Sequence, residues 1–178
     1  ESPHENPSHA HADQGAALAA AVPAQVEKRL NGLAPRPITV GARARQLHAR
    51  LVVADLHADT LLWDRDLLRR GARGHVDVPR LVAGGVALQA FTVVTRSPKN
   101  LNLERNDDRS DDITLLAVAQ RWPPATWRSL RARALHQATR LTAAARRSQG
   151  TLTLVRSAAD LDRFLERRRA DPRLVAGI

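Results

Sequence analysis

The chain has 178 residues, 43% of them hydrophobic, and this length and composition predict a single domain with a substantial core. It contains no Cys, which excludes disulfide bonds and thiolate metal sites. The formal net charge is +10, but 26 of the 28 basic residues are Arg, and many fall on predicted helix faces. No helix-turn-helix or zinc-finger spacing accompanies this charge, so we interpret it as solvated helix faces and expect no specific nucleic-acid partner. No apolar run reaches the roughly 18 residues of a membrane span, so no transmembrane segment is predicted.

Residues 1–37 are rich in Ala, Pro and His and are predicted to form a flexible arm. The pair His9 and His11 could bind a metal adventitiously, but the Pro-containing residues before it cannot form the buried strand that a built site needs. A short helix over Thr39–Arg50, with Thr39 as its cap, is expected to lead from this arm into the first strand.

The stretch from Leu51 to Thr60 is the most informative part of the sequence. Its apolar, β-branched beginning predicts a buried strand of a parallel sheet. Side chains alternate between the two faces of a strand, so His57 and Asp59 are expected to point the same way at its carboxyl end. Imidazole nitrogen and carboxylate oxygen both suit zinc, so this spacing predicts two ligands of one metal ion. The tripeptide alone favours another interpretation, a half-buried His and an Asp that caps the next helix, and the surrounding residues change this balance.

Residues 60–83 are expected to form the crossover that a parallel neighbouring strand requires, beginning with a helix over 60–70. Within it, Trp63 is interpreted as a packing residue, and Asp64 and Asp66 as solvated or salt-bridged. Asp77 is predicted to cap a short helix that has Pro at its first position. His75 stands in a loop before this cap and is not assigned to the site.

The remaining pattern continues to alternate between strands and helices, which favours an α/β fold with a parallel sheet. A polar, acidic loop at 97–112 is interpreted as solvated, with Ser110 or Asp111 capping the helix that follows. The other predicted elements are a strand over Val86–Thr95, helices over Ile113–Arg121 and Thr126–Arg147, a small strand over Thr151–Val155, a helix capped by Ser157 and running to Arg169, and a buried strand from Arg173 to Ile178.

Three separate segments carry a resemblance to a known family. In this order and spacing they resemble the amino-terminal part of the membrane dipeptidase (renal dipeptidase) family of zinc metallopeptidases, over about Ala42 to Ile178. The resemblance implies that residues 38–178 form the first β/α units of a (β/α)8 TIM-type barrel of the metallo-dependent hydrolase kind. A closed barrel takes roughly 250 residues, so we expect this sequence to be the amino-terminal portion of a larger enzyme. The segments are Asp55-Leu56-His57-Ala58-Asp59-Thr60-Leu61-Leu62-Trp63, His75-Val76-Asp77-Val78-Pro79-Arg80-Leu81 and Gly84-Gly85-Val86-Ala87-Leu88-Gln89-Ala90-Phe91.

The activity that the resemblance implies is hydrolysis of dipeptides, including those with a D-residue at the carboxyl end, by a metal-bound hydroxide. It implies two Zn²⁺ ions, and only His57 and Asp59 carry over as metal ligands. In similar proteins a bridging Glu follows the strand that corresponds to Leu174–Ile178, and the second zinc is bound by His residues of later strands. Many relatives have Gly or Asp, and Asn, where this chain has Leu56 and Ala58, which leaves the ligand atoms unchanged. We therefore expect the chain by itself to be inactive, and we assign it no substrate-binding residue.

Two alternatives remain at this point. The first is a degenerate, non-catalytic barrel that keeps the fold as a binding protein. The second is a basic nucleic-acid-binding domain, which rests on charge alone. The resemblance also suggests an exported or membrane-associated protein and allows a homodimer, although residues 16–22 are too short an apolar run for an intact signal peptide.

Overall fold

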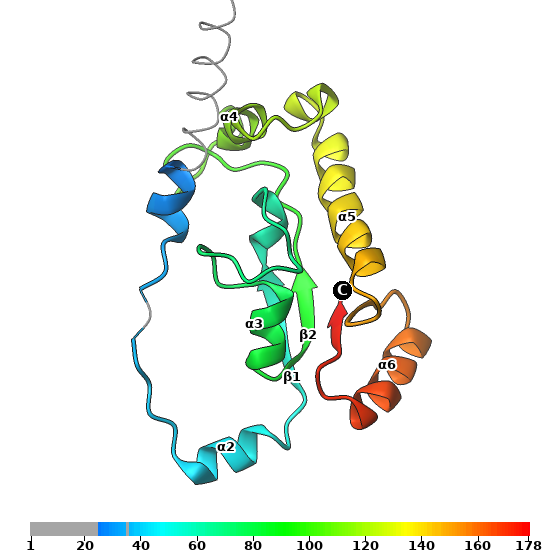
Figure 1. Ribbon diagram of the computed structural model, residues 1–178. Helices are drawn as coiled ribbons and strands as arrows, with labels where there is room; N and C mark the ends of the chain where they lie inside the picture. The colour runs from blue at the N-terminus through cyan, green and yellow to red at the C-terminus, as the bar shows by residue number, and fades with distance from the viewer. Residues whose placement is uncertain (1–24, 35) are drawn as a thin grey trace, which may run out of the picture.

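The computed structural model describes residues 25–34 and 36–178 and shows an α/β fold with one parallel sheet (Figure 1). The sheet has four strands in the order β1-β2-β4-β3. Its strands are β1 (Val53–Ala58), β2 (Val86–Phe91), β3 (Leu152–Leu154) and β4 (Val175–Gly177). Residues 25–31 are helical. The helices that follow are α2 (Ala42–His48), α3 (Val78–Ala83), α4 (Asp112–Ala119), α5 (Leu130–Arg147) and α6 (Ala158–Ala170), and two 3-10 turns are η1 (Asp59–Leu62) and η2 (Pro124–Trp127).

Every strand pair in the sheet is parallel, as the β/α alternation of the sequence predicts. The prediction that the strand in Leu51–Thr60 is buried is wrong, because Val52 and Leu56 are 64% and 75% exposed and Ala58 is the buried residue of β1. Asp55 of β1 is opposite Gln89 of β2, and Gln89 is in turn opposite Gly177 of β4. The later strand β4 lies between β2 and β3, so β3 is an addition at the outer edge of the sheet. This arrangement confirms the predicted fold class and is consistent with part of a (β/α)8 barrel.

The core is built where the helices cover the sheet. The largest cluster brings Leu141 and Ala144 of α5 against Phe91 of β2 and Val175 of β4. A second cluster places Phe164 of α6 against the opposite part of the sheet, among Ala87, Leu174 and Ala176. Helix α2 contributes nothing to this core, because none of its residues is buried, and the segment that carries it bows away from the sheet (Figure 1).

Side-chain caps set where several helices begin. Asp77, Asp111 and Ser157 each accept a backbone N–H of the following helix, as predicted. The predicted start of the long helix at Thr126 is wrong, because Ser129 caps it and the preceding residues form the separate turn η2.

The predicted helix over residues 60–70 is also wrong: only the turn η1 forms, and an irregular segment follows it to α3. The guanidinium of Arg140 in α5 donates to the carbonyl oxygens of Leu61, Trp63 and Arg65, at N···O distances of 2.8, 2.6 and 3.2 Å. A helix would need those carbonyls for its own i to i+4 hydrogen bonds. Tertiary contacts with α5 therefore replace the local helix.

The strand predicted to reach Thr95 ends at Phe91 for a similar reason. Gln137 of α5 both donates to and accepts from the backbone of Val94, and Arg133 donates to the carbonyl oxygen of Thr95 at 2.6 Å. Side chains of α5 thus take the place of a neighbouring strand.

In the described part of the chain, no helix is both long and apolar enough to cross a bilayer.

Candidate metal centre

His57 and Asp59 lie at the carboxyl end of β1, on the edge of the sheet where the parallel strands end. His57 Nε2 is 3.3 Å from Asp59 Oδ1, and the two side chains are 71% and 46% exposed. The spacing of two residues along the chain therefore brings one imidazole and one carboxylate together at an accessible position. This nitrogen and oxygen donor set fits zinc, which takes four ligands in most protein sites.

Three hydrogen bonds fix the backbone and the carboxylate around this pair. The N–H of His57 donates to Oδ1 of Asp55 at 3.1 Å, where the register between β1 and β2 is irregular from Asp55 to Ala58. On the β2 side, the N–H of Thr92 donates to the carbonyl of Ala58 at 3.1 Å. The hydroxyl of Thr92 donates to Oδ1 of Asp59. The sequence analysis did not single out Asp55 or Thr92, and no local pattern marks them.

A cavity of about 180 Å³ opens beside the pair. His57 and Asp59 form one wall, and Trp63, His75 and Asn31 belong to the others. His75, which the sequence analysis left out, thus faces the same space. It does not complete a metal shell, because the described residues contain no group of three or more His, Cys, Asp or Glu side chains placed to hold one ion.

Trp63 has two surroundings. It packs against the small core cluster of Leu62, Ile113 and Trp122, which agrees with its interpretation as a packing residue. It also lines the cavity beside His57.

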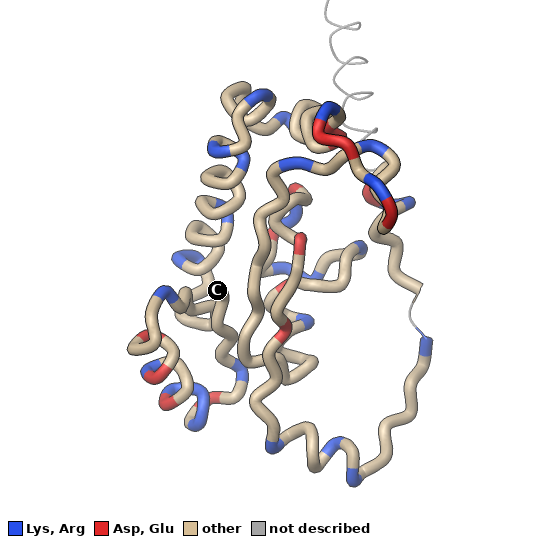
Figure 2. The backbone as a smooth tube through the Cα atoms, turned by 180° about the vertical axis from the view of Figure 1, so that it is seen from behind, with Lys and Arg blue, Asp and Glu red and all other residues tan. Residues whose placement is uncertain are grey.

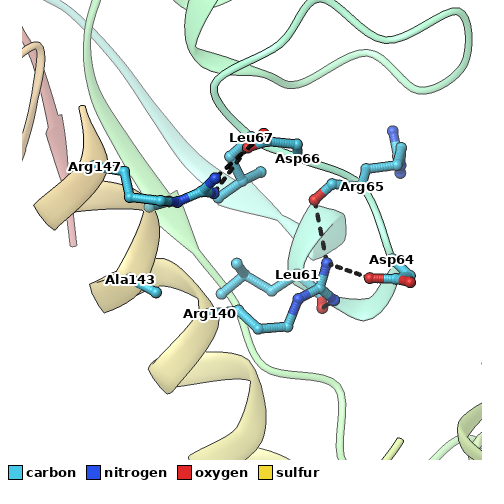
Figure 3. A pocket seen from close by; sticks show the side chains of 9 residues that line it. Leu61, Asp64, Arg65, Asp66, Leu67, Arg140, Ala143 and Arg147 are labelled. Carbon is cyan, nitrogen blue, oxygen red and sulfur yellow. Dashed lines mark hydrogen bonds and ion pairs between the residues drawn. The ribbon is translucent and has the colours of Figure 1, made fainter. Parts of the chain in front are cut away.

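Helix α5 holds the segment that follows the pair, as Figure 3 shows. Arg140 binds the carbonyls of this segment and lies 3.6 Å from Oδ1 of Asp64. Burial lowers the pKa of Arg140, and the nearby Asp64 carboxylate opposes that effect. Arg147 pairs with Asp66 at 3.0 Å. The pKa of Asp66 is lowered mainly by the backbone N–H of Leu68 and further by Arg147.

These ion pairs agree with the prediction that Asp64 and Asp66 are solvated or salt-bridged, since both carboxylates have an arginine partner. Asp64 and Asp66 also line the cavity of about 320 Å³ drawn in Figure 3, together with Arg140 and Arg147. Each of these guanidinium groups already has a carboxylate or carbonyl partner. We therefore interpret the charged residues around this cavity as supports of the fold.

The acidic loop is a capping structure, as predicted. Asp107 accepts the N–H groups of Arg109 and Ser110, and its pKa is lowered by these backbone hydrogen bonds. Asp111 caps α4.

Figure 2 shows Lys and Arg distributed over several helices and loops, with acidic residues among those of α6, rather than gathered in one continuous band.

The comparisons with known proteins agree with the sequence resemblance. The family model described as membrane dipeptidase (peptidase family M19) matches residues 41–171. This range includes β1, β2, the pair at the end of β1 and all helices from α2 to α6. Neither curated proteins nor solved structures gave a match to the chain.

Proposed function

Because the chain belongs to the membrane dipeptidase family, we propose that it is the amino-terminal part of a zinc-dependent dipeptidase in which His57 and Asp59 bind one of two zinc ions. The observation that carries this proposal is the 3.3 Å approach of His57 Nε2 to Asp59 Oδ1 at the carboxyl edge of a parallel sheet. In β/α barrels this edge is the face where the active site lies.

In this proposal each group of the chain has a limited task. His57 and Asp59 hold the ion at the end of β1, and the backbone bond from Thr92 to Ala58 keeps that end against β2. A bound zinc ion supplies a hydroxide nucleophile at neutral pH. The adjacent cavity, with Trp63 in its wall, receives part of a dipeptide substrate.

The proposal assigns residues 38–178 to the first β/α units of the barrel and residues 1–37 to an arm. Two ligands are fewer than the four that zinc takes, and the described residues bring no third one to the pair. In this proposal the bridging carboxylate and the ligands of the second ion come from outside the described residues. The chain alone is expected to bind zinc without hydrolysing dipeptides.

Zinc binding can be tested residue by residue with the chain itself. We would titrate Zn²⁺ and follow the imidazole ring signals of each His by NMR, in the native chain and in the variants H57A, D59A and H75A. We expect the His57 signals to shift with zinc, the D59A variant to bind at least about tenfold more weakly, and H75A to behave like the native chain. His57 signals that ignore millimolar zinc in the native chain would refute the metal site.

Dipeptide hydrolysis needs a separate measurement on the full gene product. We expect zinc-dependent cleavage of a dipeptide with a carboxyl-terminal D-residue, and loss of that cleavage in H57A and D59A. The second candidate function is a barrel that binds without catalysis. Zinc binding at His57 without any dipeptide cleavage by the full gene product would support that alternative.

A further inference from the structure

Thr92 is the first residue after β2 and makes two contacts with the end of β1. Its N–H donates to the carbonyl of Ala58 at 3.1 Å, which continues the pairing of the two strands by one bond. Its hydroxyl donates to Oδ1 of Asp59. The first contact is made by the backbone and would be kept with another side chain. The second depends on the hydroxyl, so the two contacts can be separated by substitution.

The hydroxyl acts on the same carboxylate oxygen that faces His57. Asp59 Oδ1 is 3.3 Å from His57 Nε2 and accepts the Thr92 hydroxyl, while Oδ2 accepts no hydrogen bond from any residue that the structure describes. A carboxylate that is 46% exposed would otherwise turn freely about its side-chain bonds. The β-branched Thr92 has few χ1 states, so its hydroxyl is a well-placed anchor.

We propose that Thr92 is a positioning residue for Asp59: its hydroxyl holds the carboxylate in the orientation in which Asp59 and His57 bind one zinc ion. This inference rests on the proposed function. Partners that orient a ligand in this way commonly change metal affinity by about 10- to 100-fold when they are removed. Thr92 would touch neither metal nor substrate, so its effect reaches the ion through Asp59 alone.

The test compares side chains of matched shape at residue 92. T92V keeps the shape and removes the hydroxyl, whereas T92S keeps the hydroxyl. T95V, three residues further along, is the matched control, because among the described residues the contact of Thr95 is made by its carbonyl, which accepts from Arg133, and not by its hydroxyl. Each variant is titrated with Zn²⁺ while the His57 ring signals are followed, and its backbone spectrum reports whether the fold is intact. If T92V fails to fold, T92A takes its place.

We expect T92V to bind zinc at His57 about tenfold or more weakly than the native chain, and T92S and T95V to stay within about threefold of it. Unchanged affinity in T92V, or equal losses in T92V and T92S, would overturn the inference. If D59A weakens binding and T92V does not, the metal site stands and only the role of Thr92 fails. If zinc does not affect His57 in the native chain, the metal site and this inference both fail.

Discussion

The arginine at position 133 offers the sharpest test of how α5 organises the loop after β2. Its side chain is 1% exposed and donates to five acceptors. They are the carbonyls of Thr126, Thr95 and Trp127, the hydroxyl of Thr114 and the carboxylate of Asp111, at 2.6 to 2.8 Å. One guanidinium thus joins the segment after β2, the cap of α4, the turn η2 and α5.

Replacing Arg133 with Met keeps most of its volume and removes every donor. Breaking a buried ion pair by removing one partner costs about 3–5 kcal/mol. The Asp111 carboxylate is 19% exposed and keeps hydrogen bonds from Ile113 and Thr114, which moderates the loss. We therefore expect R133M to lose about 3 kcal/mol of unfolding free energy. In a domain of this size that corresponds to a fall in melting temperature of about 6–12 °C.

Urea unfolding followed by circular dichroism measures this difference. The matched control is R131M, two residues away on the same helix and exposed, which should change stability by no more than about 0.5 kcal/mol. R133K should fall between R133M and the native chain, because an ammonium keeps the charge but cannot reach all five acceptors. A loss below about 1 kcal/mol in R133M would refute the reasoning that this guanidinium holds the loop.

Two further predictions concern residues that α5 contacts through Arg133 and Arg140. Burial opposes ionisation of Asp111, but hydrogen bonds from Arg133, Thr114 and two backbone N–H groups outweigh it and lower its pKa. A carboxyl group with a lowered pKa stabilises the fold at pH values above the ordinary carboxyl range, and this stabilisation is lost as pH falls through the lowered value. D111N should therefore show a shallower acid-induced fall in melting temperature than the native chain. An equal acid slope in both would contradict this. R140M should speed hydrogen exchange of the backbone amides in residues 63–67, which the Arg140 contacts hold, and leave α6 unaffected; unchanged exchange there would show that Arg140 does not maintain the segment.

The approach of His57 to Asp59 and several helix starts could be predicted because their signals are local. The spacing of His57 and Asp59 on a strand determines that they can meet, and Asp77, Asp111 and Ser157 cap helices that begin next to them. Each of these features depends on residues within a few positions of one another, where strand alternation and helix capping act directly.

What the tertiary structure alone decided involves residues far apart in the chain. Segment 60–70 has a helical pattern, yet Arg140, 75 to 79 positions later, takes the carbonyls that the helix would use. Thr92 reaches Asp59 only because β2 pairs with β1, and β4 enters the sheet between β2 and β3. Local propensity amounts to a few tenths of a kcal/mol per residue, about the size of one weak contact, whereas a hydrogen bond to a charged group contributes about 1.5–3 kcal/mol. Where the two compete, the distant contact prevails, and the sequence pattern by itself gives no sign of it.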